Sequence, residues 1–244
     1  MIIIPDIHGR QFWKDAVSGR ESEEIVFLGD YLDPYPTEDI TNDDALKNFK
    51  EILDFKKKHR ENVILLVGNH DAHYFVSPFD IGSRFCYYLE REISRLFKEN
   101  KELFLLAHEK EINSKKYTFS HSYIHSLWLN NDVYGKDNWS EDTVINALND
   151  DFEHNATFGL LLNIKSCYRG GFESYGSILW ADIREVALDK KPNVGDYAIF
   201  GHTQLKFPIV TDYVACLDCR RAFILTDSGE IQGIDGEPIE KTNN

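Results

Sequence analysis

The stretch Met1-Ile2-Ile3-Ile4-Pro5-Asp6-Ile7-His8-Gly9 decides the fold, because a short apolar run in it leads directly into polar residues. The run of isoleucines predicts a buried strand, and Asp6 and His8 follow where that strand ends. Residues two apart in an extended chain project to the same side, so a carboxylate and an imidazole come together there. Open α/β sheets build their sites at the carboxyl ends of their strands. We therefore predict a functional site at this strand end.

Two further predicted strands end in the same kind of chemistry. Residues 24–28 run into Gly29-Asp30-Tyr31-Leu32-Asp33, and residues 62–67 run into Gly68-Asn69-His70-Asp71. If the three strands are parallel, their carboxyl ends lie on one edge of a sheet and collect Asp, His and Asn side chains. Such a collection is typical of a metal site with a nearby proton donor.

Helical patterns separate these strands, at residues 10–17 and 42–59, with Thr41 or Asn42 as the cap of the second helix. The order strand, helix, strand, helix, strand is typical of parallel strands joined by right-handed crossovers. We therefore expect an α/β protein.

The rest of the chain is expected to complete one domain spanning residues 1–244. A mainly helical insert is predicted at about 80–165, in which Leu103–His108 is interpreted as a turn or a helix end. Residues 116–120 predict a strand that stops at His121. A strand at 197–200 stops at Gly201-His202-Thr203, and short strands are predicted at 214–217, 222–226 and 230–234.

Composition narrows the class of protein. The chain has 244 residues, 42% of them hydrophobic and 13% aromatic, which is typical of a globular protein. Its formal charge of −14 disfavours nucleic acid or an anionic membrane as the main partner. No run reaches the ~18 apolar residues of a membrane span, and the first residues do not resemble a signal peptide. We expect a soluble cytoplasmic protein, and its four cysteines do not indicate a disulfide framework.

The predicted strand ends together supply carboxylate, amide and imidazole groups, a mixture that suits divalent metals such as Mn, Fe or Zn. The groups are Asp6, His8, Asp30, Asn69, His70, His121 and His202. An Asp between two clusters can bridge two ions ~3.5–4 Å apart, the arrangement used for displacement at phosphorus. Such ions would lower the pKa of a bound water and supply a hydroxide that attacks phosphorus.

In their order and number these motifs resemble those of calcineurin-like metallophosphoesterases. Gly29-Asp30-Tyr31-Leu32-Asp33 and Leu179-Trp180-Ala181-Asp182 are most similar to the phosphoprotein-phosphatase branch, whose members include serine/threonine phosphatases. The resemblance extends from residue 6 to about residue 203. It implies a four-layer sandwich of two mixed β-sheets flanked by helices.

The resemblance also implies a role for each site residue. Asp6 and His8 would hold the first metal ion, Asp30 would bridge, and a second ion would lie on three further ligands: Asn69, His121 and His202. His70 would be the general acid that protonates the leaving oxygen, and Asp33 would orient it. We expect two divalent ions, with manganese as the first choice and iron or zinc as alternatives.

One departure concerns phosphate binding. The phosphatase branch has Arg-Gly after Gly-Asp-Tyr-x-Asp, and this chain has Pro34-Tyr35. Because proline cannot replace a bidentate guanidinium, another arginine must bind the phosphate. Arg169, followed by two glycines, is the first candidate, and Arg10, Arg84 and Arg184 remain open. Arg84 or Tyr87 of the insert are further candidates to meet substrate.

We expect hydrolysis of phosphomonoesters, on a phosphorylated protein or small molecule. The alternative is a diadenosine polyphosphate or nucleotide hydrolase, or a phosphodiesterase, and a binding module that has lost catalysis is a third interpretation. Oligomeric state stays open.

At single positions, a structural role is an alternative to the metal-ligand or catalytic role. Asp30 and Asn69 could be turn residues, and His125 rivals His121. Structural or surface roles suit three other histidines, namely His73, His108 and His154, and Cys216 and Cys219 are interpreted as two buried thiols.

Overall fold

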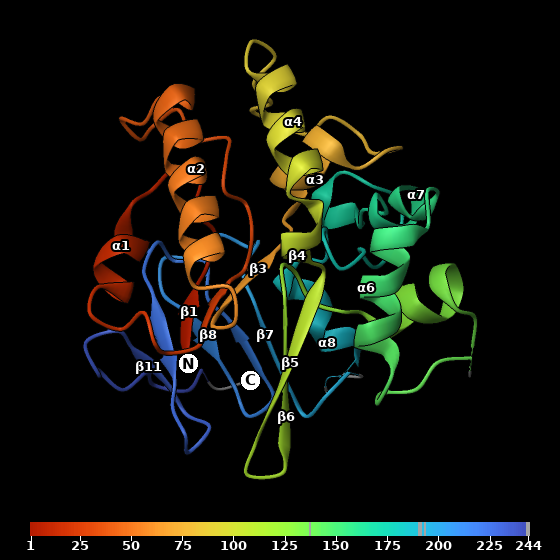
Figure 1. The fold of residues 1–244 in the computed structure, drawn as a ribbon. Helices are drawn as coiled ribbons and strands as arrows, with labels where there is room; N and C mark the ends of the chain where they lie inside the picture. The colour runs from red at the N-terminus through yellow and green to blue at the C-terminus, as the bar shows by residue number, and fades with distance from the viewer. Residues whose placement is uncertain (137, 190–191, 193, 243–244) are drawn as a thin grey trace.

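The computed structural model describes residues 1–244 except 137, 190–191, 193 and 243–244, and it forms two β-sheets with helices on both sides (Figure 1). The strands are β1 (Ile2–Ile4), β2 (Ile25–Phe27), β3 (Val63–Leu66), β4 (Phe104–Leu105), β5 (Ala107–Ile112), β6 (Lys115–Ser120), β7 (Tyr197–Phe200), β8 (Ile209–Val210), β9 (Val214–Cys216), β10 (Phe223–Leu225) and β11 (Ile231–Gly233). The α-helices are α1 (Phe12–Val17), α2 (Asn42–Lys58), α3 (Asn69–Phe75), α4 (Glu90–Glu99), α5 (Ser126–Trp128), α6 (Val144–His154), α7 (Phe158–Leu162) and α8 (Val186–Asp189). Short 3-10 or π segments are η1 (Lys101–Leu103), η2 (Leu129–Val133), η3 (Cys167–Arg169) and η4 (Ile183–Glu185).

Both sheets mix parallel and antiparallel strands. The first has the order β11-β10-β1-β2-β3-β4, with β1 to β4 parallel and β10 antiparallel to β1. The second has the order β5-β6-β7-β9-β8, with β6, β7 and β9 parallel and an antiparallel strand at each edge. The predicted parallel crossovers over the first 70 residues and the two mixed sheets are confirmed.

Alternation along the strands produces the layers. Ile2 and Ile4 of β1 join the core under the helices, whereas Ile3 joins a second core between the sheets. In β7, Ile199 faces that shared core and Phe200 packs on the outer side, in a third cluster that includes Val186 of α8. Because successive side chains point to opposite faces of a strand, each sheet is buried on both sides. The arrangement is the predicted four-layer sandwich.

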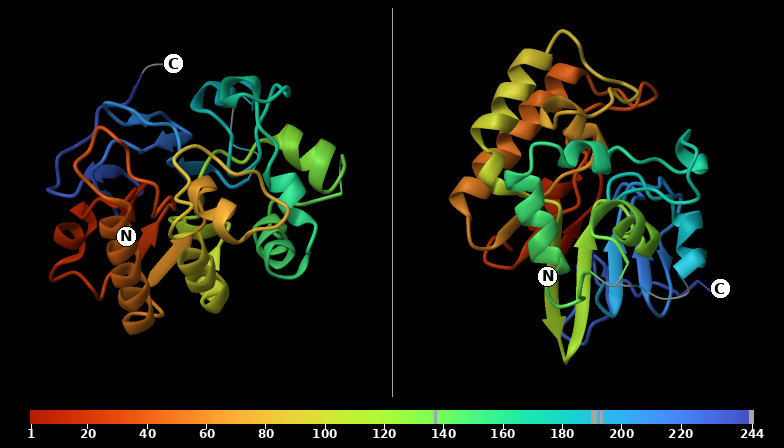
Figure 2. Two further views of the ribbon diagram at one scale, coloured as in Figure 1. Left: turned by 90° about the horizontal axis from the view of Figure 1, so that it is seen from above. Right: turned by 90° about the vertical axis from the view of Figure 1, so that its right-hand side faces the viewer.

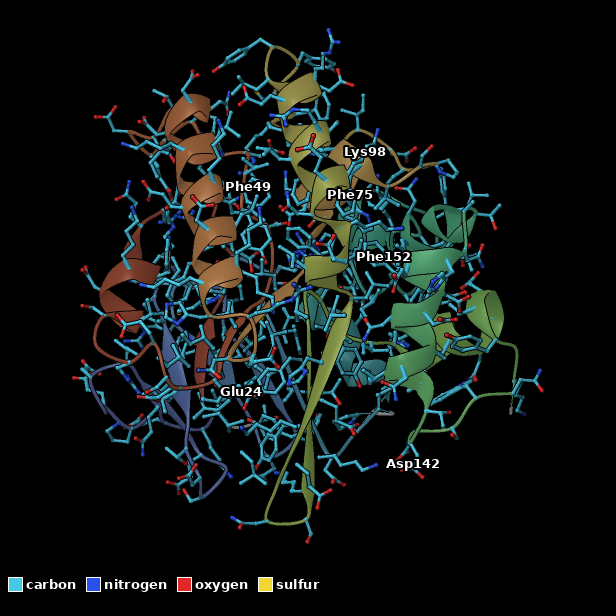
Figure 3. The ribbon with its side chains drawn as sticks, viewed as in Figure 1. Glu24, Phe49, Phe75, Lys98, Asp142 and Phe152 are labelled. Carbon is cyan, nitrogen blue, oxygen red and sulfur yellow. The ribbon has the colours of Figure 1, made fainter. Side chains whose placement is uncertain are left out.

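An aromatic cluster joins the helices that cover the first sheet. Phe97 of α4 lies with its ring centroid 4.6 Å from those of both Phe49 in α2 and Phe75 in α3. Phe75 in turn meets Phe152 of α6 edge-on at 6.0 Å, and Figure 3 labels three of these rings. Helices α2 and α4 therefore stand side by side in Figures 1 and 2. Thr41, one of the two predicted caps, accepts a hydrogen bond from the Asp44 N–H at the start of α2.

The prediction of a turn or helix end at Leu103–His108 holds only at Leu103, where η1 ends, and is wrong for the rest, because β4 and the beginning of β5 lie there. β4 extends the first sheet beside β3, and β5 pairs with β6 across a tight turn. Asn113 and Ser114 in that turn have φ of 51° and 61°, as a two-residue hairpin turn requires. Pairing with β6 thus overrides the low strand propensity of the charged β5 sequence.

The expected helical insert at 80–165 is consequently interrupted by strands that belong to both sheets. Among the described residues, no helix combines the length and apolar character needed to span a bilayer.

Candidate functional site

The carboxyl ends of strands from both sheets meet at one pocket. Asp6 and His8 follow β1, Asp30 follows β2, and Asn69 begins α3 directly after β3. The second sheet contributes His121 after β6 and His202 after β7. The pocket has a volume of about 250 Å³ and is lined by His8, Asp30, Tyr35, Asn69, His70, Ser83, Arg84, Arg169, Trp180 and His202.

The backbone turns sharply at these strand ends. His8, Asp30, Asp33 and His202 have φ of 44°, 53°, 57° and 61°, in the left-handed region. Asp and His enter this region more readily than most residues, and such strained positions cluster at functional sites.

Two glycines allow the strand ends to approach one another. A Cβ added at Gly68 would lie 2.1 Å from Oδ1 of Asp30, and one added at Gly201 would lie 2.1 Å from Oδ1 of Asp6. Real side chains do not tolerate such distances, so the residues before Asn69 and His202 must be glycine. The Asp71 carboxylate then connects two of the loops by accepting backbone N–H bonds from Asp30 and Gly68 at 2.7 and 2.8 Å.

The first group of donors consists of Asp6, His8 and Asp30, whose ligand atoms all lie within 4.8 Å of one another. His8 Nδ1 donates to the Leu32 carbonyl at 2.8 Å, so Nε2 of the neutral ring carries a lone pair and no proton. This Nε2 lies 3.4 Å from Oδ2 of Asp30. Burial lowers the pKa of His8 to about 3 and raises the pKa of Asp6 to about 6. Two carboxylates and an imidazole lone pair thus face one another out of water, an arrangement that a cation would stabilise.

A second group of ligand atoms lies on the other side of Asp30. His121 Nδ1 donates to the Leu28 carbonyl at 2.9 Å, which leaves Nε2 as a lone pair. The Nε2 atom lies 2.9 Å from Asn69 Oδ1, 3.1 Å from His202 Nδ1 and 3.6 Å from Asp30 Oδ1. Atoms that each bind one ion at about 2.0–2.2 Å are separated by about 3–3.5 Å, so this spacing fits a shared divalent cation.

Asp30 takes part in both groups, one carboxylate oxygen toward each, as a bridging ligand would. Its pKa is lowered because contacts with the surrounding histidines, His121 first, outweigh the effect of burial. His125, the alternative to His121, lies away from these donors and 3.4 Å from Asp189.

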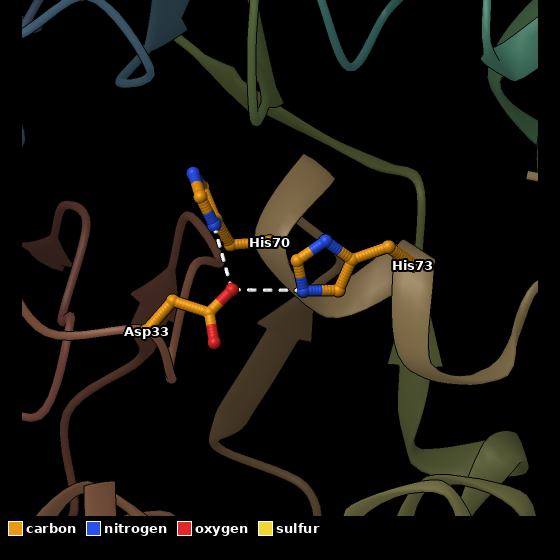
Figure 4. Close-up of side chains that lie close together, drawn as sticks. All are labelled: Asp33, His70 and His73. Carbon is orange, nitrogen blue, oxygen red and sulfur yellow. Dashed lines mark hydrogen bonds and ion pairs between the residues drawn. The ribbon is translucent and has the colours of Figure 1, made fainter. Parts of the chain in front are cut away.

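Asp33 is the centre of a buried hydrogen-bonding cluster with residues of α3. Its Oδ2 lies 2.8 Å from His70 Nδ1 and 2.8 Å from His73 Nε2, as Figure 4 shows. The Tyr74 hydroxyl donates to Oδ1 at 2.5 Å. Burial opposes ionisation of Asp33, but the contacts with His70 and His73 outweigh it and lower the pKa of the carboxyl group.

Each of the two rings has another partner besides Asp33. Arg84 donates to His70 Nε2 at 3.0 Å, and the Gly82 N–H donates to His73 Nδ1 at 3.1 Å. The other nitrogen of each ring is the one that faces Asp33. Asp33, His70 and His73 are close enough to hold a metal ion. His70 Nδ1 makes a hydrogen bond with the carboxylate, whereas His73 Nε2 lies at ion-pair distance from it without hydrogen-bond geometry.

Sequence reasoning did not assign a functional place to His73 or Tyr74. His73 lies three residues after His70, and that spacing on a helix was an available signal for a shared face. It is buried, not at the surface, whereas His154 is exposed beside Asp150.

The candidate arginines separate into two groups. Arg84 and Arg169 line the pocket, whereas Arg10 and Arg184 are not among its lining residues. Arg10 is paired with Glu38 at 2.7 Å, and Arg184 is paired with Asp182 at 2.7 Å. Arg169 is anchored by Asp182 at 3.0 Å and by the Thr203 hydroxyl at 2.8 Å, on the His202 side of the pocket. Tyr87 is exposed and does not line the pocket.

Comparison with known families places these features in context. The family model described as calcineurin-like phosphoesterase matches residues 2–205, so the chain belongs to that family. The chain is thus a metal-dependent phosphoesterase, and the family resemblance inferred from the motifs is confirmed.

Two solved structures are compared with this chain, both at low sequence identity. A cold-active protein tyrosine phosphatase gives a TM-score of 0.56 at 14% identity, covering 96% of this chain and 76% of that one. A protein serine/threonine phosphatase from Saccharomyces cerevisiae gives a TM-score of 0.48 at 15% identity, covering 99% and 81%. Among proteins of curated function, no significant sequence match is found.

Proposed function

We propose that this chain is a binuclear-metal phosphoesterase that hydrolyses phosphomonoesters. The observation that carries the proposal is the pair of buried groups of ligand atoms that share Asp30. Asp6 and His8 would hold one ion together with Asp30. The other ion would take Asn69, His121 and His202 as further ligands.

Two divalent cations at these positions would supply Lewis acidity at phosphoryl oxygens and a water molecule of lowered pKa as the nucleophile. Manganese is our first choice, and iron and zinc are the alternatives. All three metals accept imidazole and carboxylate ligands. The buried histidines suit this role, since burial lowers the pKa of His8 and of His202 and keeps the rings neutral.

His70 is proposed as the general acid. Its Nε2 is on the pocket side of the ring, and its Nδ1 is held by Asp33 at 2.8 Å. When Nε2 carries a proton, Asp33 stabilises the imidazolium and keeps the ring aimed at the leaving oxygen. Arg169 would bind a phosphate oxygen from the His202 side, because Asp182 and Thr203 hold its guanidinium in place.

The test uses metal-stripped protein reloaded separately with manganese, iron or zinc. Hydrolysis of p-nitrophenyl phosphate is measured beside that of bis-p-nitrophenyl phosphate. We expect turnover of the monoester that a chelator abolishes, and a decrease of about 10²-fold in His70→Asn. His154→Asn, at an exposed histidine, is the matched control and should retain full activity.

Preference for the diester would instead support the alternative, a phosphodiesterase or a hydrolase of nucleotide or diadenosine polyphosphates. Absence of turnover with either ester, in protein that binds two ions, would contradict the proposal. Phosphoproteins and small phosphorylated molecules are both compatible substrates, and the assay should be extended to each.

A further inference from the structure

Among the described residues, Arg84 differs from the other candidate arginines in having no acidic partner. Within the described residues, it makes no ion pair with a carboxylate, whereas Arg10, Arg169 and Arg184 each do. It nevertheless lines the pocket and is only partly exposed. A guanidinium without a counter-ion at the edge of a pocket is a ready partner for an anion.

The Arg84 side chain is held in place by uncharged partners. Its Cζ lies 3.8 Å from the centroid of the Tyr35 ring, a cation–π contact. One Nη group donates to the Asp33 carbonyl and the other donates to His70 Nε2. Because a guanidinium has five N–H groups, about three stay available for a ligand.

The segment around Arg84 is fastened to α3 on both sides of the residue. The Gly82 N–H donates to His73 at 3.1 Å, and the Cys86 N–H donates to the Tyr74 hydroxyl at 2.8 Å. His73 and Tyr74 both contact Asp33. The segment after α3, drawn in gold, crosses the middle of the molecule in the view from above in Figure 2. Arg84 is therefore positioned before any ligand arrives, which lowers the cost of binding one.

Pro34-Tyr35 stands where the phosphatase branch has Arg-Gly after Gly-Asp-Tyr-x-Asp. Pro34 takes the place of that arginine, and the guanidinium of Arg84, from another segment, lies over the ring of the next residue, Tyr35. The guanidinium thereby reaches the pocket beside His8 and His70, while Arg169 reaches it beside His202.

We infer that Arg84, supported by Tyr35, is a phosphate-binding residue that makes the site selective for phosphomonoesters. The inference rests on the proposed function. A monoester offers three non-bridging oxygens and two negative charges at neutral pH, and a diester offers two oxygens and one charge. A second guanidinium therefore favours the monoester.

The test measures binding of inorganic phosphate to manganese-loaded protein by titration calorimetry, together with steady-state kinetics on the two nitrophenyl esters. In Arg84→Gln we expect phosphate affinity to fall at least tenfold. We also expect KM for the monoester to rise about tenfold, with less than a threefold change for the diester. Arg84→Lys should recover part of the affinity, because it restores the charge without the planar fork.

Arg91→Gln is the matched control, since Arg91 is exposed on α4 and makes no ion pair within the described residues. It should bind phosphate as the unaltered chain does. Tyr35→Leu is a second variant for the same test, because it removes the aromatic ring that supports Arg84 and keeps Arg84 itself. It should weaken phosphate binding in the same direction.

Unchanged phosphate affinity in folded Arg84→Gln, or equal losses for both esters, would overturn the inference. If the unaltered chain hydrolyses neither ester, the proposed function fails, and the calorimetric comparison still decides whether Arg84 binds phosphate.

Discussion

The Asp33 carboxylate accepts contacts from three side chains of α3, and these contacts connect the candidate acid to the rest of the protein. His70, His73 and Tyr74 reach it at 2.8, 2.8 and 2.5 Å. A negative charge held by several donors in a buried place fixes both the position and the tautomer of the imidazole that it contacts.

Asp33→Asn is expected to lower kcat about 10²-fold, because an amide cannot accept from all these donors or stabilise an imidazolium. Its NH₂ group would face N–H or O–H groups. Steady-state kinetics on p-nitrophenyl phosphate checks this, with a smaller change in KM than in kcat. Tyr74→Phe keeps both imidazole contacts with Asp33, and its kcat should fall less than tenfold. A kcat of Asp33→Asn within threefold of the unaltered chain would contradict the role.

Gly201→Ala should weaken metal binding by about 10- to 100-fold, a loss typical of changes that displace a ligand's supporting structure. The new Cβ would lie 2.1 Å from Oδ1 of Asp6 and push that carboxylate away from His8. Gly19→Ala is the control: φ there is also positive, at 73°, but a Cβ meets nothing within 4 Å. Metal titration by calorimetry should show normal affinity in the control, and equal affinity in both variants would refute the prediction.

At the scale of elements, Glu24 connects the two sheets. It precedes β2 of the first sheet and pairs with His108 and Lys110, both on β5 of the second. Figure 3 labels its side chain. The contact with His108, followed by that with Lys110, lowers the pKa of Glu24 to about 2 against the opposing effect of burial.

Glu24→Gln should therefore destabilise the fold at neutral pH and much less in acid. A carboxyl group whose pKa is lower in the folded chain stabilises that state fully above its unfolded pKa of 4.5, and the contribution is lost as the pH falls toward 2. Allowing for solvent screening of this partly exposed group, we expect a loss of about 1–2 kcal/mol at pH 7. Urea unfolding at pH 7, 5, 4 and 3 measures it.

Glu61→Gln serves as the control for Glu24, because Glu61 is exposed and has no ion pair within the described residues. It should change the free energy of unfolding by less than about 0.5 kcal/mol at each pH. If the free energy of unfolding of Glu24→Gln differed from that of the unaltered chain by the same amount from pH 7 to pH 3, the proposed role of Glu24 would be contradicted.

At the scale of the whole molecule, the donor groups join segments from both sheets. Asp6, Asp30 and Asn69 follow strands of the first sheet, and His121 and His202 follow strands of the second. Ions bound among them would stabilise the folded chain only, because the unfolded chain does not bring these groups together.

Metal removal should therefore lower Tm. For a chain of this size, saturation of one site at about 100 times Kd contributes about 2.7 kcal/mol, so reloading with manganese should raise Tm by about 5 °C or more. Thermal unfolding of stripped and reloaded protein checks this, and Asp30→Asn should lose most of the increase. Equal Tm values for the stripped and reloaded chain would count against metal binding at this site.

The sequence by itself determined the strand ends. Runs such as Ile2–Ile4 followed by Asp6 and His8 are local signals, and the periodicity of strands and helices is encoded in neighbouring residues. These signals were sufficient for the parallel first strands, the family and the group of candidate ligands. The charged β5 segment was misjudged, because its strand depends on pairing with β6 and not on its own composition.

Only the tertiary structure decided which side chains meet. It placed His121 and not His125 beside Asn69, and it brought His73 to Asp33. Arg10 is paired with Glu38, whereas Arg84 lines the pocket with no acidic partner among the residues that the structure describes. The physical reason is that these contacts join residues that are dozens of positions apart in the chain. Their distances follow from how sheets, helices and loops pack, and no local pattern in the chain records that packing.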